Sequence, residues 1–332
     1  MAIDGTSLDV PDTGANDEAF GRPAAARGEG SAFPTSRMVG FGECGTHVLV
    51  DVAIGPYDTG ENTLATQLVR SLSPGMLVLG DRGFGGSYQL FQTMAATGAD
   101  LLWRAKSSTV LPVLERFEDG SYRSELVIKD PTSTKRQVLA IRVIAYEIED
   151  EGRPEVNDTT YRLITTILDP SQAPAYELAT LYPERWEFET LLDELKTHQR
   201  GPRVVLRSKS PEGVRQEIYG YLCTHYAIRA LMCEVAGQDG LDPDRVSFTR
   251  SIRAARRSVR AGIGTTARAL SDALCVAVAE IASELLPEQP LRAAARVVKR
   301  KMSKFGVKRA VHRNWPRLTK RAGEGIRVLA AP

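Results

Sequence analysis

The chain has 332 residues, of which 42% are hydrophobic and 25% charged, as is usual for a soluble globular protein. No basic segment leads into an apolar run, so we expect no signal peptide. The most apolar stretch, residues 270–286, carries three acidic residues, so we expect a buried amphipathic helix there and not a membrane span. Four scattered cysteines without a CxxC pair argue against a zinc site and a disulfide scaffold, and fit a reducing cytoplasm.

The net charge of +2 conceals a strong asymmetry between the two ends of the chain. Residues 251–332 hold 18 Lys and Arg against five Asp and Glu, a net charge of +13, which leaves −11 for residues 1–250. Such a split predicts an anionic polymer as the partner of the tail. A solvated basic tail that aids solubility is the alternative.

The first third of the chain predicts alternating strands and helices. A strand opens the chain, a long loop follows, and a hairpin leads to a helix, a short buried strand, a second helix and another strand. These elements are expected at residues 2–10, 11–36, 38–54, 60–72, 76–79, 87–97 and 101–104. Strand signals then dominate residues 110–168, and helical patterns follow.

This order predicts an α/β fold with a ribonuclease-H-like mixed sheet and helices on both faces. A mostly β insertion domain interrupts it, and a helical, basic C-terminal region follows. We expect the first part of the catalytic core at residues 1–108, the insertion at 109–170, the second part of the core at 171–236 and the basic region at 237–332.

An unusually polar stripe marks one predicted helix. Tyr182, Arg185, Glu189 and Lys196 are spaced by 3, 4 and 7 residues and fall on one side of an ideal α-helix. A carboxylate among cationic and hydrogen-bonding groups suits a metal held against a phosphate backbone. A solvated face with ion pairs between successive turns is the alternative.

Two aspartates occupy comparable places at strands. Asp81 follows an apolar strand and Gly80, and Asp4 lies in the first strand. Neighbouring strands would bring both carboxylates together, and Glu189 would join them from its helix. Three such carboxylates can hold a pair of hard divalent cations, Mg²⁺ or Mn²⁺, for phosphoryl transfer. Each aspartate also has a structural interpretation without a metal: Asp4 as a turn former, and Asp81 as a helix or turn cap.

The segment YPERWEFETLLDELK resembles the Y-x₂-R-x₃-E-x₆-K signature of DDE transposases of the insertion-sequence-four family, at every spacing. The segments AIDGTSLDVPD and LVLGDRGF resemble those around the first and second aspartates of that family. Residues 110–168 fit the place where the family carries a β-rich insertion. The resemblance covers nearly all of the chain up to about residue 235.

The resemblance implies a catalytic, metal-binding triad of Asp4, Asp81 and Glu189. It also implies that Tyr182, Arg185 and Lys196 hold transposon-end DNA through its phosphates. The expected cofactor is Mg²⁺, or Mn²⁺ in its place, as two ions. The expected reaction is DNA cleavage at transposon ends followed by strand transfer into target DNA.

We further expect double-stranded DNA as the partner, a homodimer on DNA, and a cytoplasmic, nucleoid-associated protein with no membrane contact. No nucleotide cofactor is expected, because the glycine-rich segment 80–86 lacks the G-K-[ST] of a phosphate loop.

Other residues extend the predicted DNA surface. Trp186 either stacks on an extruded base or packs against the β insertion. Four arginines near one face of a later helix suit contacts with the DNA backbone, with a solvated face as the alternative. They are Arg253, Arg256, Arg257 and Arg260.

Members of the family usually carry a helical domain before the first catalytic strand, whereas Asp4 is the fourth residue here. We therefore expect an N-terminally truncated form. This leaves two alternatives to an active transposase. One is a catalytically impaired remnant that binds DNA or forms mixed dimers and so inhibits transposition. The other is a cellular ribonuclease-H-like nuclease, which would leave Tyr182, Arg185 and Lys196 without a shared purpose.

Overall fold

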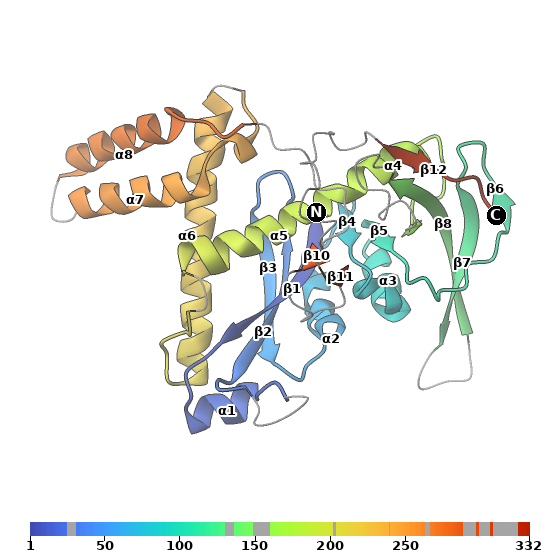
Figure 1. Cartoon of the computed structure of the whole chain (residues 1–332), viewed down its shortest axis with the longest axis horizontal. Coiled ribbons are helices and arrows are strands. Elements are labelled where there is room, and N and C mark those ends of the chain that lie inside the picture. The colour runs from blue at the N-terminus through green and yellow to red at the C-terminus, as the bar shows by residue number, and fades with distance from the viewer. Residues whose placement is uncertain are drawn as a thin grey trace. The chain divides into compact units, whose positions relative to one another are not determined.

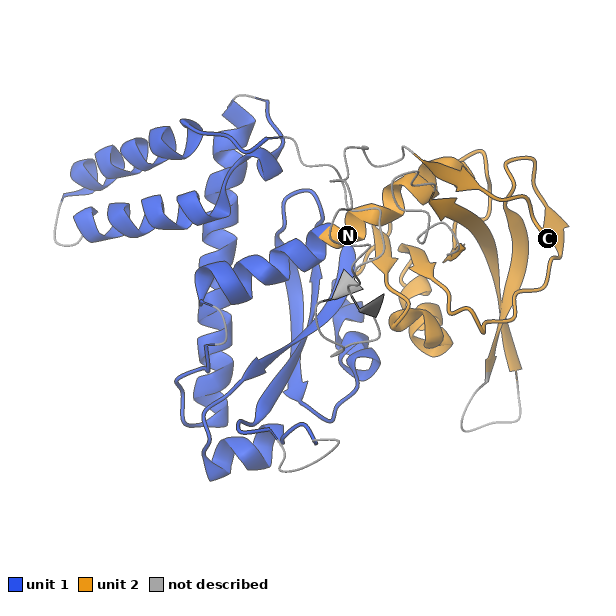
Figure 2. Ribbon diagram, in the orientation of Figure 1, with its two compact units in different colours: residues 1–71, 187–288 blue, residues 72–186, 289–332 orange. Residues whose placement is uncertain are grey.

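A computed structural model of the chain divides into two compact units (Figures 1 and 2). Unit 1 comprises residues 1–71 and 187–288, and unit 2 comprises residues 72–186 and 289–332. The structure describes residues 1–24, 31–129, 136–148, 160–201, 204–238, 240–262, 266–287 and 325–332, and the backbone of two short strands at 297–298 and 306–307. The domain boundaries expected from the sequence remain a prediction.

Unit 1 contains a three-stranded antiparallel sheet in the order β3-β2-β1. The strands are β1 (Ala2–Asp9), β2 (Thr35–Gly42) and β3 (Leu49–Pro56). They confirm the expected first strand and the hairpin after it. The expected loop at residues 11–36, by contrast, contains the helix α1 (Gly14–Phe20).

Helices cover both faces of this sheet. On one face, Leu64 of α2 (Glu61–Ala65) lies against Gly55. On the other face, α5 (Trp186–Asp193) approaches β2 at Gly40 and Gly42. A Cβ at either glycine would lie 3.0 Å from the ring of Phe188, so the absent side chains permit the close approach. A 3₁₀ turn, η1 (Thr66–Ser71), follows α2.

The remainder of unit 1 is helical. The π-helical segment η5 (Glu194–Gln199) directly follows α5. Then come α6 (Pro211–Gln238), the 3₁₀ turn η6 (Pro243–Arg245), α7 (Phe248–Gly262) and α8 (Ala267–Ala282). Helices α6, α7 and α8 share an apolar core that includes Met232, Ile252 and Ile281. The apolar stretch expected to be a buried helix instead exposes much of its surface, because Leu270 and Val276 of α8 are 49% and 68% exposed.

Unit 2 contains strands in the order β4-β5-β9-β8-β7-β6. The pair β4–β5 is parallel and the others are antiparallel, so the sheet is mixed, as expected. The strands are β4 (Leu77–Gly80), β5 (Asp100–Arg104), β6 (Glu115–Arg116), β7 (Tyr122–Lys129), β8 (Arg136–Ile148) and β9 (Tyr161–Thr165).

The helices of unit 2 are short. Its C-terminal part, expected to be helical, also contains strands. The 3₁₀ turn η2 (Phe84–Gly86), α3 (Tyr88–Ala95), α4 (Ala175–Leu181) and the 3₁₀ turn η4 (Tyr182–Arg185) are its helical elements among the described residues. Near the C-terminus, β12 (Ile326–Val328) pairs with β8, and β10 (Val297–Val298) pairs with β11 (Gly306–Val307).

Candidate functional site

Asp4 lies on the face of β1 that α5 covers. Its register partner on β2 is Gly40, and opposed residues of an antiparallel pair point to the same face. The ring of Phe188 in α5 packs on Gly40. The carboxylate of Asp4, whose Oδ1 accepts a 2.8 Å hydrogen bond from the N–H of Gly5, therefore belongs to the surface on which α5 rests.

Two further predicted site residues belong to the helical run on this face. Glu189 directly follows Phe188 and is half-buried. Lys196 Nζ donates a 2.8 Å hydrogen bond to Oγ1 of Thr6, which stands two residues after Asp4 and shares its face. Burial is the main cause that lowers the pKa of Lys196. Unit 1 thus places Asp4 on the face that α5 covers and brings Lys196 to Thr6 on that face, while Glu189 belongs to α5 itself.

Asp81 stands in unit 2, directly after β4. Its Oδ1 accepts hydrogen bonds of 2.7 and 3.2 Å from the N–H groups of Gly83 and Phe84. The turn-capping role considered from the sequence is therefore present. The same two bonds fix the direction of the carboxylate at the end of the strand.

Tyr182 and Arg185 belong to the surroundings of Asp81 in unit 2. Tyr182 Oη donates a 3.1 Å hydrogen bond to the carbonyl oxygen of Gly80. Burial raises the pKa of Tyr182 to about 12; Arg185 opposes this shift and Asp81 adds to it. The phenol is therefore a protonated donor at neutral pH.

The polar stripe differs in two respects from its sequence-based description. Tyr182 and Arg185 are only 4% and 6% exposed, so a solvated face is wrong for this end of the stripe. The run is also not one α-helix, because a 3₁₀ turn precedes α5 and a π-helical segment follows it. Angles of an ideal helix do not apply across these junctions, and π segments are frequent at functional sites.

Trp186 packs beside its neighbour in sequence. The guanidinium carbon of Arg185 lies 4.9 Å from the centroid of the Trp186 ring, within range of a cation–π interaction. The ring is half-buried. This contact gives Trp186 a packing role, and stacking on a base stays a prediction.

The four arginines of α7 are exposed, but two of them are engaged within unit 1. Arg256 Nη2 donates a 3.2 Å hydrogen bond to the carbonyl oxygen of Gln199, and Arg257 forms an ion pair with Glu280. Arg253 and Arg260 are seven residues apart and share a face of the helix. They are the arginines of this group best placed to meet a phosphate.

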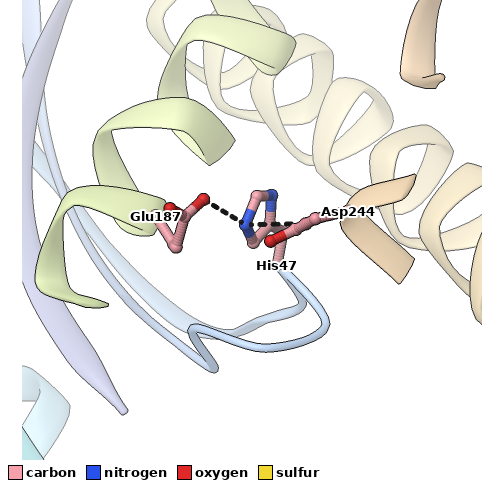
Figure 3. Close-up of side chains that lie close together, drawn as sticks. All are labelled: His47, Glu187 and Asp244. Carbon is pink, nitrogen blue, oxygen red and sulfur yellow. Dashed lines mark hydrogen bonds and ion pairs between the residues drawn. The ribbon is translucent and has the colours of Figure 1, made fainter. Parts of the chain in front are cut away.

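A cluster that the sequence reading missed lies in unit 1 (Figure 3). It joins His47 of the β2–β3 turn, Glu187 of α5 and Asp244 of η6. His47 Nε2 is 3.1 Å from Glu187 Oε2 and 3.3 Å from Asp244 Oδ1. The imidazole is 1% exposed, and its residue has a φ of 54°. A non-glycine residue in this left-handed region is uncommon and is often associated with function.

A second layer of charged groups surrounds His47. Glu194 Oε1 lies 3.7 Å from His47 Nδ1. Glu194 Oε2 accepts a 2.9 Å hydrogen bond from Arg229 Nε and lies 3.1 Å from His225 Nε2. Burial by itself would raise the pKa of Glu194, but these partners lower it to about 2.

The pKa values of His47 and Asp244 are both raised, but by different causes. Burial lowers the pKa of His47 less than its bonds to Glu187 and Glu194 raise it, so the net shift is upward. Burial raises the pKa of Asp244 to about 6, although the charge of His47 opposes that shift. No local sequence signal connects these residues, since His47 and Asp244 are far apart in the chain and come together only through the fold.

The chain belongs to the DDE transposase family. The model of the family described as "Transposase DDE domain" matches residues 1–226, about two thirds of the sequence. The chain is also 28% identical over 308 residues to the transposase InsG for insertion sequence element IS4 of Escherichia coli (strain K12), covering 92% of this chain and 68% of that protein. The resemblance to insertion-sequence-four transposases is thereby confirmed.

Two further similarities are weaker. The putative transposase InsZ of Escherichia coli (strain K12) is 28% identical over 171 residues, which cover 46% of this chain and 56% of InsZ. A solved structure of the piggyBac transposase synaptic complex with hairpin DNA matches 87% of this chain and 57% of that chain, with 13% identity and a TM-score of 0.44. The chain thus spans little more than half the length of these two proteins. In the described part of the chain, no helix is long and apolar enough to cross a membrane.

Proposed function

We propose that this protein is a metal-dependent DNA transposase that cleaves DNA at transposon ends and transfers the freed end to target DNA. The observation that carries the proposal is the packing of Phe188 in α5, next to Glu189, on Gly40 and Gly42 of β2, on the face of the sheet that also bears Asp4. Both Asp4 and Glu189 lie within residues 1–226, the part of the chain that matches the transposase DDE domain. We also propose a ribonuclease-H-like core and action as a homodimer on DNA.

The residues in each unit fit a divalent cation. Asp4 and Glu189 in unit 1 and Asp81 in unit 2 offer only carboxylate oxygens, the ligands that Mg²⁺ and Mn²⁺ prefer. Asp81 is already oriented by the N–H groups of Gly83 and Phe84. When bound, a pair of such ions would activate the attacking oxygen and stabilise the leaving oxygen of a phosphoryl transfer.

The cationic residues of the signature would hold the DNA backbone. Arg185 carries a planar guanidinium that matches two phosphate oxygens, and Lys196 offers a compact ammonium. Tyr182 would hold the 3₁₀ turn η4, which also contains Arg185, in place through its hydrogen bond to the carbonyl oxygen of Gly80. Phosphate contacts of this kind set the register of the DNA and do not read its sequence.

The proposal is tested by incubating the full chain with a linear DNA that carries the terminal repeats found beside its gene. With Mg²⁺ or Mn²⁺ we expect single-strand nicks at the repeat ends, and with a chelator none. Nicking that is equally fast on DNA without the repeats would favour a general nuclease. Binding without any metal-dependent nicking would favour a DNA-binding inhibitor.

The exposed arginines of α7 give a second measurable expectation. We expect Arg253→Gln to weaken binding to DNA of any sequence and to reduce the slope of log affinity against log salt by about 1, as for one lost phosphate contact. The measurement is fluorescence anisotropy over a range of salt concentrations. Arg268→Gln, also an exposed arginine but on α8, is the matched control and should leave the slope unchanged.

A further inference from the structure

The cluster of His47, Glu187 and Asp244 has the dimensions of a metal site distinct from the proposed carboxylate triad. One ligand atom from each residue lies within 4.8 Å of the other two. Nε2 of His47 is 3.1 and 3.3 Å from the two carboxylate oxygens. In a tetrahedral zinc site with bonds of about 2.0–2.1 Å, ligand atoms are about 3.3–3.4 Å apart, so these two spacings are close to two edges of such a tetrahedron.

The charge of the cluster calls for a cation. Glu187, Glu194 and Asp244 supply three carboxylates, and Arg229 supplies one guanidinium. With neutral imidazoles, two negative charges remain in excess in a largely buried place. Isolated charges are costly to bury; a divalent ion would offset both of these charges, whereas one protonated imidazole would offset only one.

His47 presents Nε2 to Glu187 and Asp244, and its Nδ1 faces Glu194 and Arg229. With the proton on Nδ1, 3.7 Å from Glu194 Oε1, Nε2 would present its lone pair to a metal ion. A carboxylate behind a ligating histidine is the usual outer arrangement of zinc sites. Arg229 Nη2 also contacts Nδ1, and because a guanidinium can only donate, this contact favours the imidazole proton on Nε2 in the metal-free chain. A metal ion and that proton therefore compete for Nε2.

Burial and access are consistent with metal binding. The side chain of His47 is 1% exposed, whereas the side chains of Glu187 and Asp244 are 24% and 35% exposed. The Oδ1 atom of Asp244 is itself buried; it lies 3.3 Å from His47 Nε2 and 3.7 Å from Arg229 Nη1, and it accepts no hydrogen bond from the described residues. A bound cation would give this oxygen a direct partner. Solvent could fill a fourth coordination position at the exposed side.

We propose that His47, Glu187 and Asp244 bind one divalent transition-metal ion of the zinc class. The imidazole nitrogen separates this site from the all-oxygen triad, because nitrogen ligands favour Zn²⁺ or Co²⁺ over Mg²⁺. The ion would join the β2–β3 turn, the start of α5 and η6 within unit 1. Since Glu187 stands two residues before Glu189, the site would be a positioning element for the helix that carries Glu189.

The test uses Co²⁺ as a spectroscopic probe of the metal-free full chain, in excess Mg²⁺ so that hard oxygen sites are filled. We expect one equivalent of Co²⁺ to give visible absorption bands of a nitrogen–oxygen site, and Zn²⁺ to abolish them by displacement. His47→Gln should weaken Co²⁺ binding by more than about 100-fold. Glu189→Gln should retain the bands, so the result is independent of the proposed transposase chemistry.

Folding is checked in the same samples by circular dichroism and thermal melting. Zn²⁺ should raise the melting temperature of the wild-type chain and of Glu189→Gln but not that of His47→Gln. Asp244→Asn, at a half-exposed position, serves if His47→Gln does not fold, and it too should bind Co²⁺ weakly. Absence of saturable Co²⁺ bands in the wild-type chain, or equal binding in the folded variants, would overturn the proposal in favour of a protonated ion-pair cluster.

Discussion

Glu189→Gln is expected to lower the rate of metal-dependent end cleavage by about 10³-fold or more, because it replaces a proposed metal ligand with a neutral amide. DNA affinity should stay the same or rise, since a negative charge near the phosphates is removed. Single-turnover nicking of end DNA measures the rate, and anisotropy measures the affinity. The substitution is nearly isosteric, so the helix should be retained.

Asp193→Asn is the matched control for this prediction. It makes the same change from carboxylate to amide at the end of α5, where the side chain of Asp193 is 59% exposed. Its nicking rate should lie within a few-fold of wild type. Near-wild-type nicking by Glu189→Gln would remove Glu189 from the proposed triad, whereas equal losses in both variants would indicate a general effect on the helix.

Asp119→Asn is expected to destabilise unit 2 by about 3 kcal/mol, the lower end for breaking a buried ion pair. Asp119 Oδ2 accepts 2.9 Å bonds from Arg142 Nη2 and from the N–H of Ala175, and Oδ1 accepts from the N–H of Ser121 at 3.0 Å. Arg142 is fully buried, so the variant leaves its charge without a counterion. Urea unfolding followed by the fluorescence of buried Trp103 measures the change.

The same pair predicts a pH dependence. Burial alone would raise the pKa of Asp119, but bonds from Ser121 and Ala175 and the charge of Arg142 lower it below its ordinary value of 3.8. The stabilisation is therefore complete above about pH 4 and is lost as pH falls through the lowered pKa. Asp119→Asn should flatten this acid branch of the stability curve. Glu118→Gln, an exposed neighbour, should reproduce the wild-type curve. A wild-type curve from Asp119→Asn would show that the pair contributes little.

Much of the fold could be predicted because its signals are local. The alternation of the first strand, the hairpin around residue 45 and the strands of residues 110–168 follow from side-chain periodicity and turn residues. The signature helix carries a spacing specific enough to identify the family. These signals need no knowledge of distant contacts.

The elements that were missed depend on such contacts. The short helix α1 is capped by Thr13, and its buried Asn16 bonds the carbonyl oxygen of Ser208 far along the chain. The strand β12 has three residues and is defined only by its pairing with β8. The π segment after α5 leaves no mark in the residue pattern. The His47 cluster is missed for the same reason, since its members come from a turn, a helix and a 3₁₀ turn.

Gly40 and Gly42 are positions at which the close approach of α5 leaves no room for a larger residue. They contribute no functional group, yet the space above them sets how far α5 stands from β1. A methyl group at Gly42 would meet both the carbonyl oxygen of Val48 at 2.8 Å and the ring of Phe188, so the helix would have to move. Two positions without side chains thus allow the helix that carries Glu189 to approach the sheet that carries Asp4.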